Sequence, residues 1–172
     1  MKQRSMLFLT LCLGLMLNVS ACANSQSKET QSHQHHSPTT EIALGDISIT
    51  ALKEGYPHFF HEDDFQEDPV TIEQLKSLAT PLTITVFFGT WCHDSQREVP
   101  RLLTLLHEVN NPNIELKLIA LSLQKDEPGN RAKHYKITNT PTFVVEKDGQ
   151  EIGRITEVPR QSAGKDLLHI IQ

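Results

Sequence analysis

The 172-residue sequence is poor in cysteine, in tryptophan and tyrosine, and in positive charge. Three cysteines, Cys12, Cys22 and Cys92, are too few to build a disulfide framework, so each needs its own explanation. Lys and Arg number 16 against 21 Asp and Glu, and no basic patch follows the sequence, which argues against binding to nucleic acid. The length predicts one domain with appendages, and 38% hydrophobic residues suffice for one core.

The N-terminal segment carries a long apolar run. Residues 6–19 follow a positively charged start and are too few to span a bilayer comfortably. They lead into Val19-Ser20-Ala21-Cys22, which resembles the lipobox of bacterial lipoproteins. The resemblance implies cleavage before Cys22 and lipid on its thiol, and two or more acyl chains make a stable membrane anchor. The alternative is an ordinary secretory signal in which Cys22 has no role.

Cleavage at that point divides the chain into a signal peptide (1–21), a tether (22–40) and a domain (41–172). The mature chain then has 172 − 21 = 151 residues. We expect it to face an extracytoplasmic, oxidising compartment of the cell envelope. Ala23, directly after the lipid site, favours the outer membrane, facing the periplasm, if the organism is Gram-negative.

The tether is polar, without periodicity and rich in Ser, Thr and Gln, which predicts a disordered spacer. It contains three histidines: His33, His35 and His36. These side chains could collect a metal ion, but a solvated spacer is the simpler interpretation because no cysteine or carboxylate cluster lies nearby.

From residue 41 onward, hydrophobic periodicity predicts an edge element and a helix, followed from residue 82 by the order strand, helix, strand, helix, strand, strand, helix. They are an edge strand or hairpin in 42–49, a helix in 71–79, a strand in 82–88, a helix in about 92–109, a strand in 114–123, a short helix in 129–136, a hairpin in 142–155 and a helix in 161–171. This order predicts an α/β fold with a mixed central sheet and helices on both faces.

Residues 54–69 are mixed, aromatic and acidic, and their pattern predicts no regular element. The favoured interpretation is an acidic surface loop with three inward aromatic side chains: Phe59, Phe60 and Phe65. The alternative is a cluster of ligands that includes His58, His61 and the acids at 62–64.

Trp91-Cys92-His93-Asp94-Ser95 stands where the buried strand gives way to a helix. The first residues of a helix have backbone N–H groups without helical partners, and the helix dipole is positive there. Both effects favour a thiolate. After cleavage Cys92 is also the one free thiol in the predicted domain, so we expect it to be the nucleophile.

At this point the chain resembles the thioredoxin superfamily, over about residues 71–172. Four features occur in the family's order: the Trp91–Ser95 motif, Pro100 within the following helix, Thr140-Pro141-Thr142, and the Lys147-Asp148-Gly149 turn before a closing helix. Pro100 stands where thioredoxins kink the active-site helix. The resemblance implies a thioredoxin-like fold and a cis peptide bond before Pro141, beside Cys92.

The second position of the thioredoxin Cys-x-x-Cys motif is Ser95. Its hydroxyl can hydrogen-bond to the Cys92 thiolate but cannot displace a bound sulfur, so a mixed disulfide would need an external thiol or reductase. Val86 occupies a position that holds a buried acid in many thioredoxins, and no proton relay is evident there. Gly89 stands at the position where peroxiredoxins need Thr, and Gln96 stands where copper-delivery relatives with this fold need a second Cys. Neither of these two motifs is therefore present.

The resemblance also implies roles for the neighbours of Cys92. Trp91 would cover one side of the thiol. His93, if protonated, would stabilise the thiolate, whereas Asp94 would oppose it or pair with His93. The backbone of Thr140, before Pro141, would pair with an extended substrate as an added strand.

Three functions remain open. The favoured one is a cell-envelope thiol–disulfide redox protein in which Cys92 attacks a protein or small-molecule disulfide and an external thiol releases it. The second is a redox-inactive binding or chaperone module with the same fold. The third is metal handling by Cys92, His93 and the tether histidines. No cofactor is expected.

Overall fold

The computed structural model describes residues 41–60 and 64–172, which lie in one structural unit. The predicted signal peptide, the tether and Cys22 lie outside the described residues, as do His61, Glu62 and Asp63. None of the helices in the described ranges is long and apolar enough to cross a bilayer.

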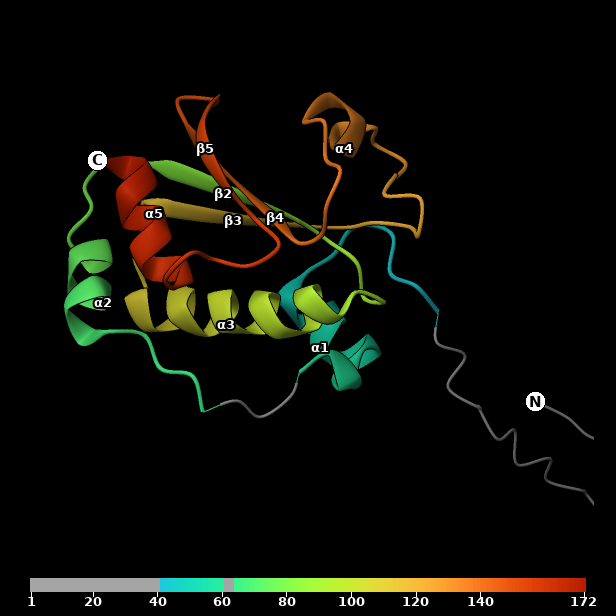
Figure 1. Ribbon diagram of the computed structural model, residues 1–172, viewed down its shortest axis with the longest axis horizontal. Helices are drawn as coiled ribbons and strands as arrows, with labels where there is room; N and C mark the ends of the chain where they lie inside the picture. Colours follow the sequence, from blue (N-terminus) through green and yellow to red (C-terminus); the bar gives the residue numbers. More distant parts are fainter. Residues whose placement is uncertain (1–40, 61–63) are drawn as a thin grey trace, which may run out of the picture. The chain divides into compact units, whose positions relative to one another are not determined.

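A five-stranded mixed sheet organises the described unit (Figure 1). Its strand order is β1-β3-β2-β4-β5, with β2 and β3 parallel and the other pairs antiparallel. The strands are β1 (Gly45–Asp46), β2 (Leu82–Phe88), β3 (Ile114–Ala120), β4 (Thr142–Lys147) and β5 (Gln150–Thr156). The predicted α/β, thioredoxin-like fold is confirmed.

The central strand β2 is the most buried, because it lies between two other strands and is covered on both faces. Its alternate residues belong to different cores. Val86 and Phe88 join the larger apolar cluster, whereas Phe87 joins the smaller one on the opposite face. A strand covered on both faces explains the nearly continuous apolar sequence of residues 84–88.

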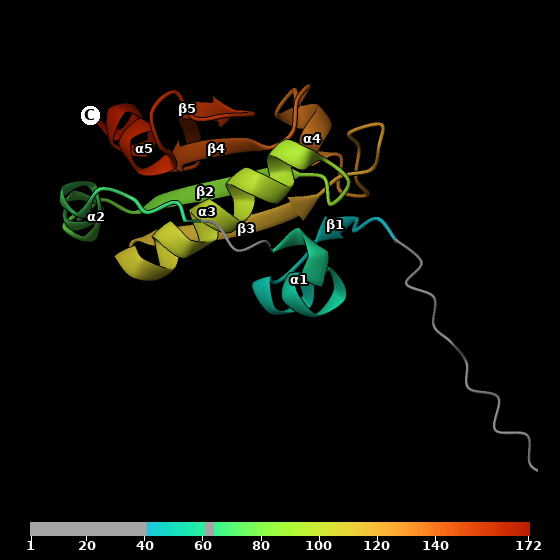
Figure 2. The same ribbon diagram turned by 60° about the horizontal axis from the view of Figure 1, so that its bottom comes forward.

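Helices pack on both faces of the sheet (Figures 1 and 2). They are α1 (Ile49–Gly55), α2 (Pro69–Lys76), α3 (His93–Val109), α4 (Arg131–His134) and α5 (Ala163–Ile171), with a short 3-10 turn at Pro57–Phe59. The larger core holds side chains of α1, α2, α3 and α5, while α4 contributes to the smaller one.

Two predicted elements near the N-terminal side are defined more closely by the structure. Of the edge strand or hairpin expected in 42–49, the edge strand is present with two residues, because Ser48 ends the extended segment by capping α1 through a bond from the Ala51 N–H (3.1 Å). Helix α2 begins at Pro69, two residues before the predicted start. There Asp68 accepts a hydrogen bond from the Val70 N–H (3.0 Å), and a proline suits the first helical position.

The aromatic segment is folded against the core. Phe59 is fully buried and contacts Phe88, with ring centroids 5.4 Å apart. Phe60 and Phe65 are partly buried, so the predicted inward orientation is complete only for Phe59.

A buried carboxylate joins this region to the end of the chain. Glu67 accepts hydrogen bonds from the Ser162 hydroxyl (2.8 Å) and the Gly164 N–H (2.9 Å) at the start of α5. A Cβ at Gly164 would lie 2.6 Å from Glu67 Oε2, so the close approach requires glycine. Glu67 therefore supplies an acceptor for an N–H group that α5 itself leaves without a partner.

A second buried carboxylate, that of Glu127, orders the loop before α4. It accepts hydrogen bonds from the N–H groups of Gly129 (2.6 Å), Arg131 and Ala132 (3.3 Å). The Arg131 guanidinium contacts Glu127 and also forms two bonds to Asp46 of β1, of 2.7 and 2.8 Å. These contacts connect the edge strand to the loop that precedes α4.

Candidate active site

Cys92 is the N-cap residue of α3, at the point where β2 ends. Its N–H donates to the Gly89 carbonyl (3.0 Å), and its own carbonyl accepts from the Gln96 N–H (2.9 Å). The side chain is partly buried. The turn of residues 89–91 therefore places the thiol at the positive end of α3, as the sequence predicted.

The peptide bond between Thr140 and Pro141 is cis, which confirms the prediction from the resemblance. The Cys92 Sγ donates a hydrogen bond to the Thr140 carbonyl oxygen at 3.1 Å. Thr140 and Pro141 are both buried, and the Pro141 carbonyl accepts from the Glu157 N–H (2.7 Å). The structure therefore brings the predicted nucleophile and the predicted cis-proline loop into direct contact.

Ser95 is fully buried, and its hydroxyl has a partner that the sequence did not indicate. Its Oγ accepts a hydrogen bond from the Gly89 N–H at 3.3 Å, and no bond between this hydroxyl and the Cys92 thiol occurs within residues 64–172. The reason is geometric: Ser95 lies against the end of β2, where the Gly89 N–H needs an acceptor. Ser95 thus stabilises the active-site turn.

Asp94 has a partner that neither of its two expected roles included. Its carboxylate pairs with the Arg97 guanidinium (2.7 Å) and not with His93, which is exposed. Arg97 also bonds to Glu98 (2.6 Å), and the hydrogen bonds to Glu98 and Asp94 raise the pKa of Arg97. The negative charge two residues from Cys92 is therefore balanced within the first turns of α3.

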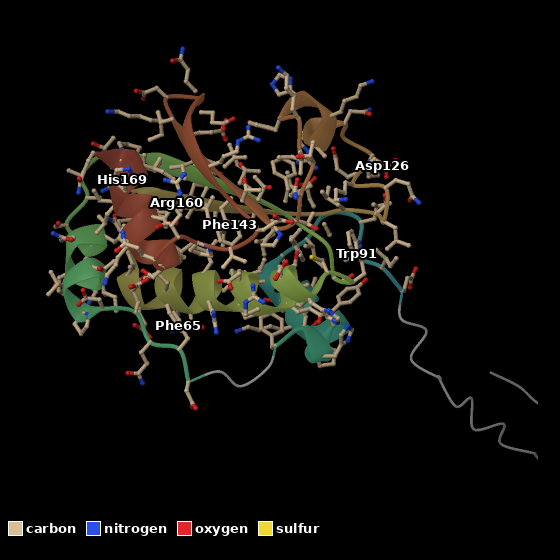
Figure 3. The ribbon with its side chains drawn as sticks, in the orientation of Figure 1. Phe65, Trp91, Asp126, Phe143, Arg160 and His169 are labelled. Carbon is tan, nitrogen blue, oxygen red and sulfur yellow. The ribbon has the colours of Figure 1, made fainter. Side chains whose placement is uncertain are left out.

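Trp91 is held at the same end of the sheet (Figure 3). Its indole N–H donates to the Leu121 carbonyl at 3.0 Å, and its ring lies against Gly89. A Cβ at Gly89 would approach Trp91 Cε2 to 2.5 Å, so this packing requires glycine. The indole is thus fixed beside the active-site turn, and its role as a cover for the thiol stays a prediction.

Thr90 was missed by the sequence reasoning, although it connects the turn to two other segments. Its hydroxyl accepts from the Ala43 N–H (3.3 Å), and its carbonyl accepts from the Gln96 side-chain amide (2.8 Å). No local motif marks the contact with Ala43, because Ala43 lies 47 residues before Thr90. Two leucines near this end of the sheet, Leu44 and Leu123, are more than half exposed.

A groove of about 510 Å³ runs along α3 and begins next to Cys92. Its wall includes His93, Gln96, Arg97, Pro100, Arg101 and Phe65. The Arg101 guanidinium lies 4.9 Å from the centre of the Phe65 ring, a cation–π contact. His93 is therefore on the groove side of α3, whereas the Cys92 thiol is directed at Thr140.

The described ranges contain no group of three or more His, Cys, Asp or Glu side chains arranged to hold a metal ion. Cys92 and His93 have no further ligand there. The predicted tether histidines and His61 lie outside these ranges. Val86, at the position of the buried acid of many thioredoxins, is fully buried in β2.

Comparison with known proteins agrees with this geometry. Residues 53–165 match the family model described as Thioredoxin, which covers more than half of the chain. A thioredoxin of Echinococcus granulosus is 34% identical over 74 residues, covering 43% of this chain and 64% of the relative. Mitochondrial thioredoxin-3 of Saccharomyces cerevisiae is 35% identical over 69 residues, covering 40% of this chain and 50% of the relative. The chain belongs to the thioredoxin family.

The matches cover parts of these proteins. The chain spans half to about two thirds of the lengths of these two relatives. Among solved structures, a Pseudomonas aeruginosa protein of unknown function superimposes with a TM-score of 0.50 at 21% identity, covering 62% of this chain and 74% of that protein. This last likeness shows the shared fold alone.

Proposed function

We propose that this protein is a thiol–disulfide redox protein of the cell envelope that uses Cys92 as its single nucleophile. The observation that carries the proposal is the contact between the Cys92 thiol, at the N-terminus of α3, and the carbonyl before cis-Pro141. A helix N-terminus supports a thiolate, and the cis-proline loop offers backbone to an extended substrate.

The reaction has two steps. The Cys92 thiolate attacks one sulfur of a disulfide, a new S–S bond forms, and the other substrate sulfur leaves as a thiolate. Ser95 cannot complete the reaction because an alcohol does not displace sulfur here. An external thiolate therefore attacks the mixed disulfide, and Cys92 is released as a thiolate. The substrate is a protein or small-molecule disulfide.

The Thr140 carbonyl has a role in the first step. In the free protein it accepts the thiol proton of Cys92. Once Cys92 has lost that proton, the sulfur no longer donates, and the carbonyl is free to accept an N–H from the substrate backbone. This exchange of donors couples attack by Cys92 to strand-like binding of the substrate.

The sequence of the N-terminal segment supports a proposed location. We propose that lipid on Cys22 anchors the protein, with the domain outside the cytoplasm. If the organism is Gram-negative, the outer membrane, facing the periplasm, is the proposed site, because Ala23 follows the lipidated residue.

A single-turnover experiment tests the redox proposal. The mature protein is mixed with glutathione disulfide and its intact mass is measured, with Cys92→Ser as the matched control. The expected product is one glutathione adduct on the wild-type protein, which dithiothreitol then removes. A folded protein whose Cys92 stays unmodified would instead support the redox-inactive binding module.

A further inference from the structure

The end of β5 lies beside the start of β4, which the cis-proline loop precedes (Figure 1). Glu157, the first residue after β5, donates its N–H to the Pro141 carbonyl at 2.7 Å. Its carboxylate accepts a hydrogen bond from the Asn139 side-chain amide at 2.8 Å. Glu157 therefore contacts both sequence neighbours of Thr140, whose carbonyl oxygen binds the Cys92 thiol.

The charge of Glu157 is not balanced by a nearby cation. The side chain is exposed, and within residues 41–60 and 64–172 it forms no ion pair. The two arginines nearest along the chain are engaged differently: Arg154 pairs with an acid of its own strand (2.6 Å), and Arg160 lines a separate hollow beside α5. In the first turn of α3, by contrast, Asp94 is paired with Arg97. Glu157 thus gives the rim of the site an unbalanced negative charge.

An extended substrate that pairs with Thr140 can reach this carboxylate. Cys92 follows β2, and β4 lies between β2 and β5. Neighbouring strands lie about 4.8 Å apart, so Glu157 is about 10 Å from the strand that leads to the nucleophile. An extended peptide covers that distance in about three residues. The substrate side chain that meets Glu157 therefore belongs to a residue about three positions from the reactive cysteine.

We infer that Glu157 selects disulfide substrates that carry a lysine or arginine about three residues from the reactive cysteine. The inference rests on the proposed redox function and names a substrate class for it. The cationic group pairs with the Glu157 carboxylate while Thr140 holds the substrate backbone, and an acidic group in the same place is repelled. Val158, next in the chain, is half-exposed and offers an apolar surface to the stem of a long cationic side chain.

The chemical step is the same for every substrate. The Cys92 thiolate attacks one sulfur of the substrate, the S–S bond of the substrate breaks, and its other sulfur leaves as a thiolate. The ion pair acts on the encounter and on the bound complex. Its effect is therefore expected in the second-order rate constant for formation of the mixed disulfide, and it should weaken as salt screens the exposed carboxylate.

The test uses two peptide disulfides and the mature protein. Each is a homodimer of an alanine-based peptide with one cysteine, and either lysine or glutamate occupies the third position on both sides of that cysteine. Adduct formation is followed by intact mass, with Cys92→Ser as the blank. Dividing by the rate of each peptide with glutathione removes differences in intrinsic reactivity. At low salt we expect the lysine peptide to react about fivefold faster than the glutamate peptide.

Glu157→Gln should reduce this ratio to about half or less. The amide oxygen of the new side chain can still accept the bond from Asn139. Because the chain carries 21 acidic residues against 16 Lys and Arg, cationic peptides are also attracted in a general way. Asp148→Asn is the matched control for that attraction. Asp148 is exposed, lies in the turn at the other end of β5 and has a similar backbone (φ 53° against 60° at Glu157), so the variant should keep the wild-type ratio.

A reversal of charge separates selection from a change in the loop. Glu157→Lys should make the glutamate peptide the faster substrate, which a merely structural effect would not do. A ratio that Glu157→Gln leaves unchanged, or that Asp148→Asn lowers equally, overturns the inferred selectivity and leaves Cys92 as the nucleophile. A protein that forms no Cys92 adduct with either peptide or with glutathione disulfide overturns the proposed redox function itself.

Discussion

The thiol of Cys92 donates to the carbonyl oxygen of Thr140 at 3.1 Å, across 48 positions of sequence. This bond joins the N-terminus of α3 to the loop that contains cis-Pro141. The nucleophile and the backbone proposed to hold the substrate are therefore positioned by the same contact.

Ser95→Cys should convert the single-thiol site into a two-thiol site. Residue 95 lies three positions after Cys92 in the first turn of α3, where side chains at that spacing are neighbours. With glutathione disulfide, we expect the variant to release both glutathiones and gain an internal disulfide, seen by intact mass. The wild-type protein and Ser95→Ala should keep one glutathione. A stable adduct on the Ser95→Cys variant would contradict the assigned geometry.

Gly89→Ala should destabilise the protein, because the new Cβ would lie 2.5 Å from the Trp91 ring. Urea unfolding should show a loss of about 1–3 kcal/mol, as for other overpacked sites. The emission of the single tryptophan should shift as well. Gly55→Ala is the matched control, because nothing lies within 4 Å of its Cβ position and its stability should not fall. Equal losses in both variants would argue against the Trp91–Gly89 contact.

Arg97→Ala should slow the reaction of Cys92 with iodoacetamide. Removing the guanidinium leaves the Asp94 carboxylate without its 2.7 Å partner, and an unbalanced negative charge nearby disfavours the thiolate. Because both side chains are partly exposed, we expect a decrease of roughly threefold at low salt, shrinking as ionic strength rises. Asp94→Asn/Arg97→Ala should recover the wild-type rate. A double variant as slow as Arg97→Ala would assign the effect to packing.

Glu127→Gln should reduce the free energy of unfolding at neutral pH, and this reduction should be smaller in acid. Burial alone would raise the pKa of Glu127, but hydrogen bonds from the backbone N–H groups of Gly129, Arg131 and Ala132 and from the Arg131 guanidinium outweigh it and lower the pKa below 4.5. A carboxylate whose pKa is lower in the folded than in the unfolded state stabilises the protein at pH values above its unfolded-state pKa. This contribution is lost as the pH falls through the folded-state pKa.

The measurement is the free energy of unfolding of the wild-type and Glu127→Gln proteins, from neutral pH down to below the folded-state pKa of Glu127. We expect a difference of about 1–3 kcal/mol at pH 7, since hydrogen bonds to a buried charge are lost. The two curves should converge below the folded-state pKa of Glu127. A difference that stays constant down to the acid limit would show that the carboxylate charge has no part in the stabilisation.

The fold was predictable where the signal is local. The β-branched, apolar run of residues 84–88 predicts a buried strand, and the helix after it follows from the spacing of Val99, Leu102 and Val109. The cis-proline loop beside Cys92 came from the resemblance, because no periodicity places Pro141 next to a residue 49 positions earlier. Asp94 and Arg97 have the spacing of an ion pair on one face of a helix. The sequence did not single out this pair, because the adjacent His93 is another possible partner for Asp94.

The rest depends on contacts between distant segments. The Ala43–Thr90 and Glu67–Gly164 bonds connect residues 47 and 97 positions apart. In both pairs the donor is a backbone N–H, and no sequence pattern marks Thr90 or Glu67 as its acceptor. The partner of Ser95 could not be found from the sequence for a related reason. The nearest thiol along the chain is that of Cys92, yet the hydroxyl accepts from the Gly89 N–H, just past the end of β2.

The Glu67 carboxylate also imposes an order on biosynthesis. Its partners, the Ser162 hydroxyl and the Gly164 N–H, are made 95 and 97 residues later. A nascent chain therefore has to keep this carboxylate hydrated until residue 164 has left the ribosome. A chain that stops before Ser162 would leave a charged group facing the core without these two partners, which gives quality-control proteases a means to recognise it.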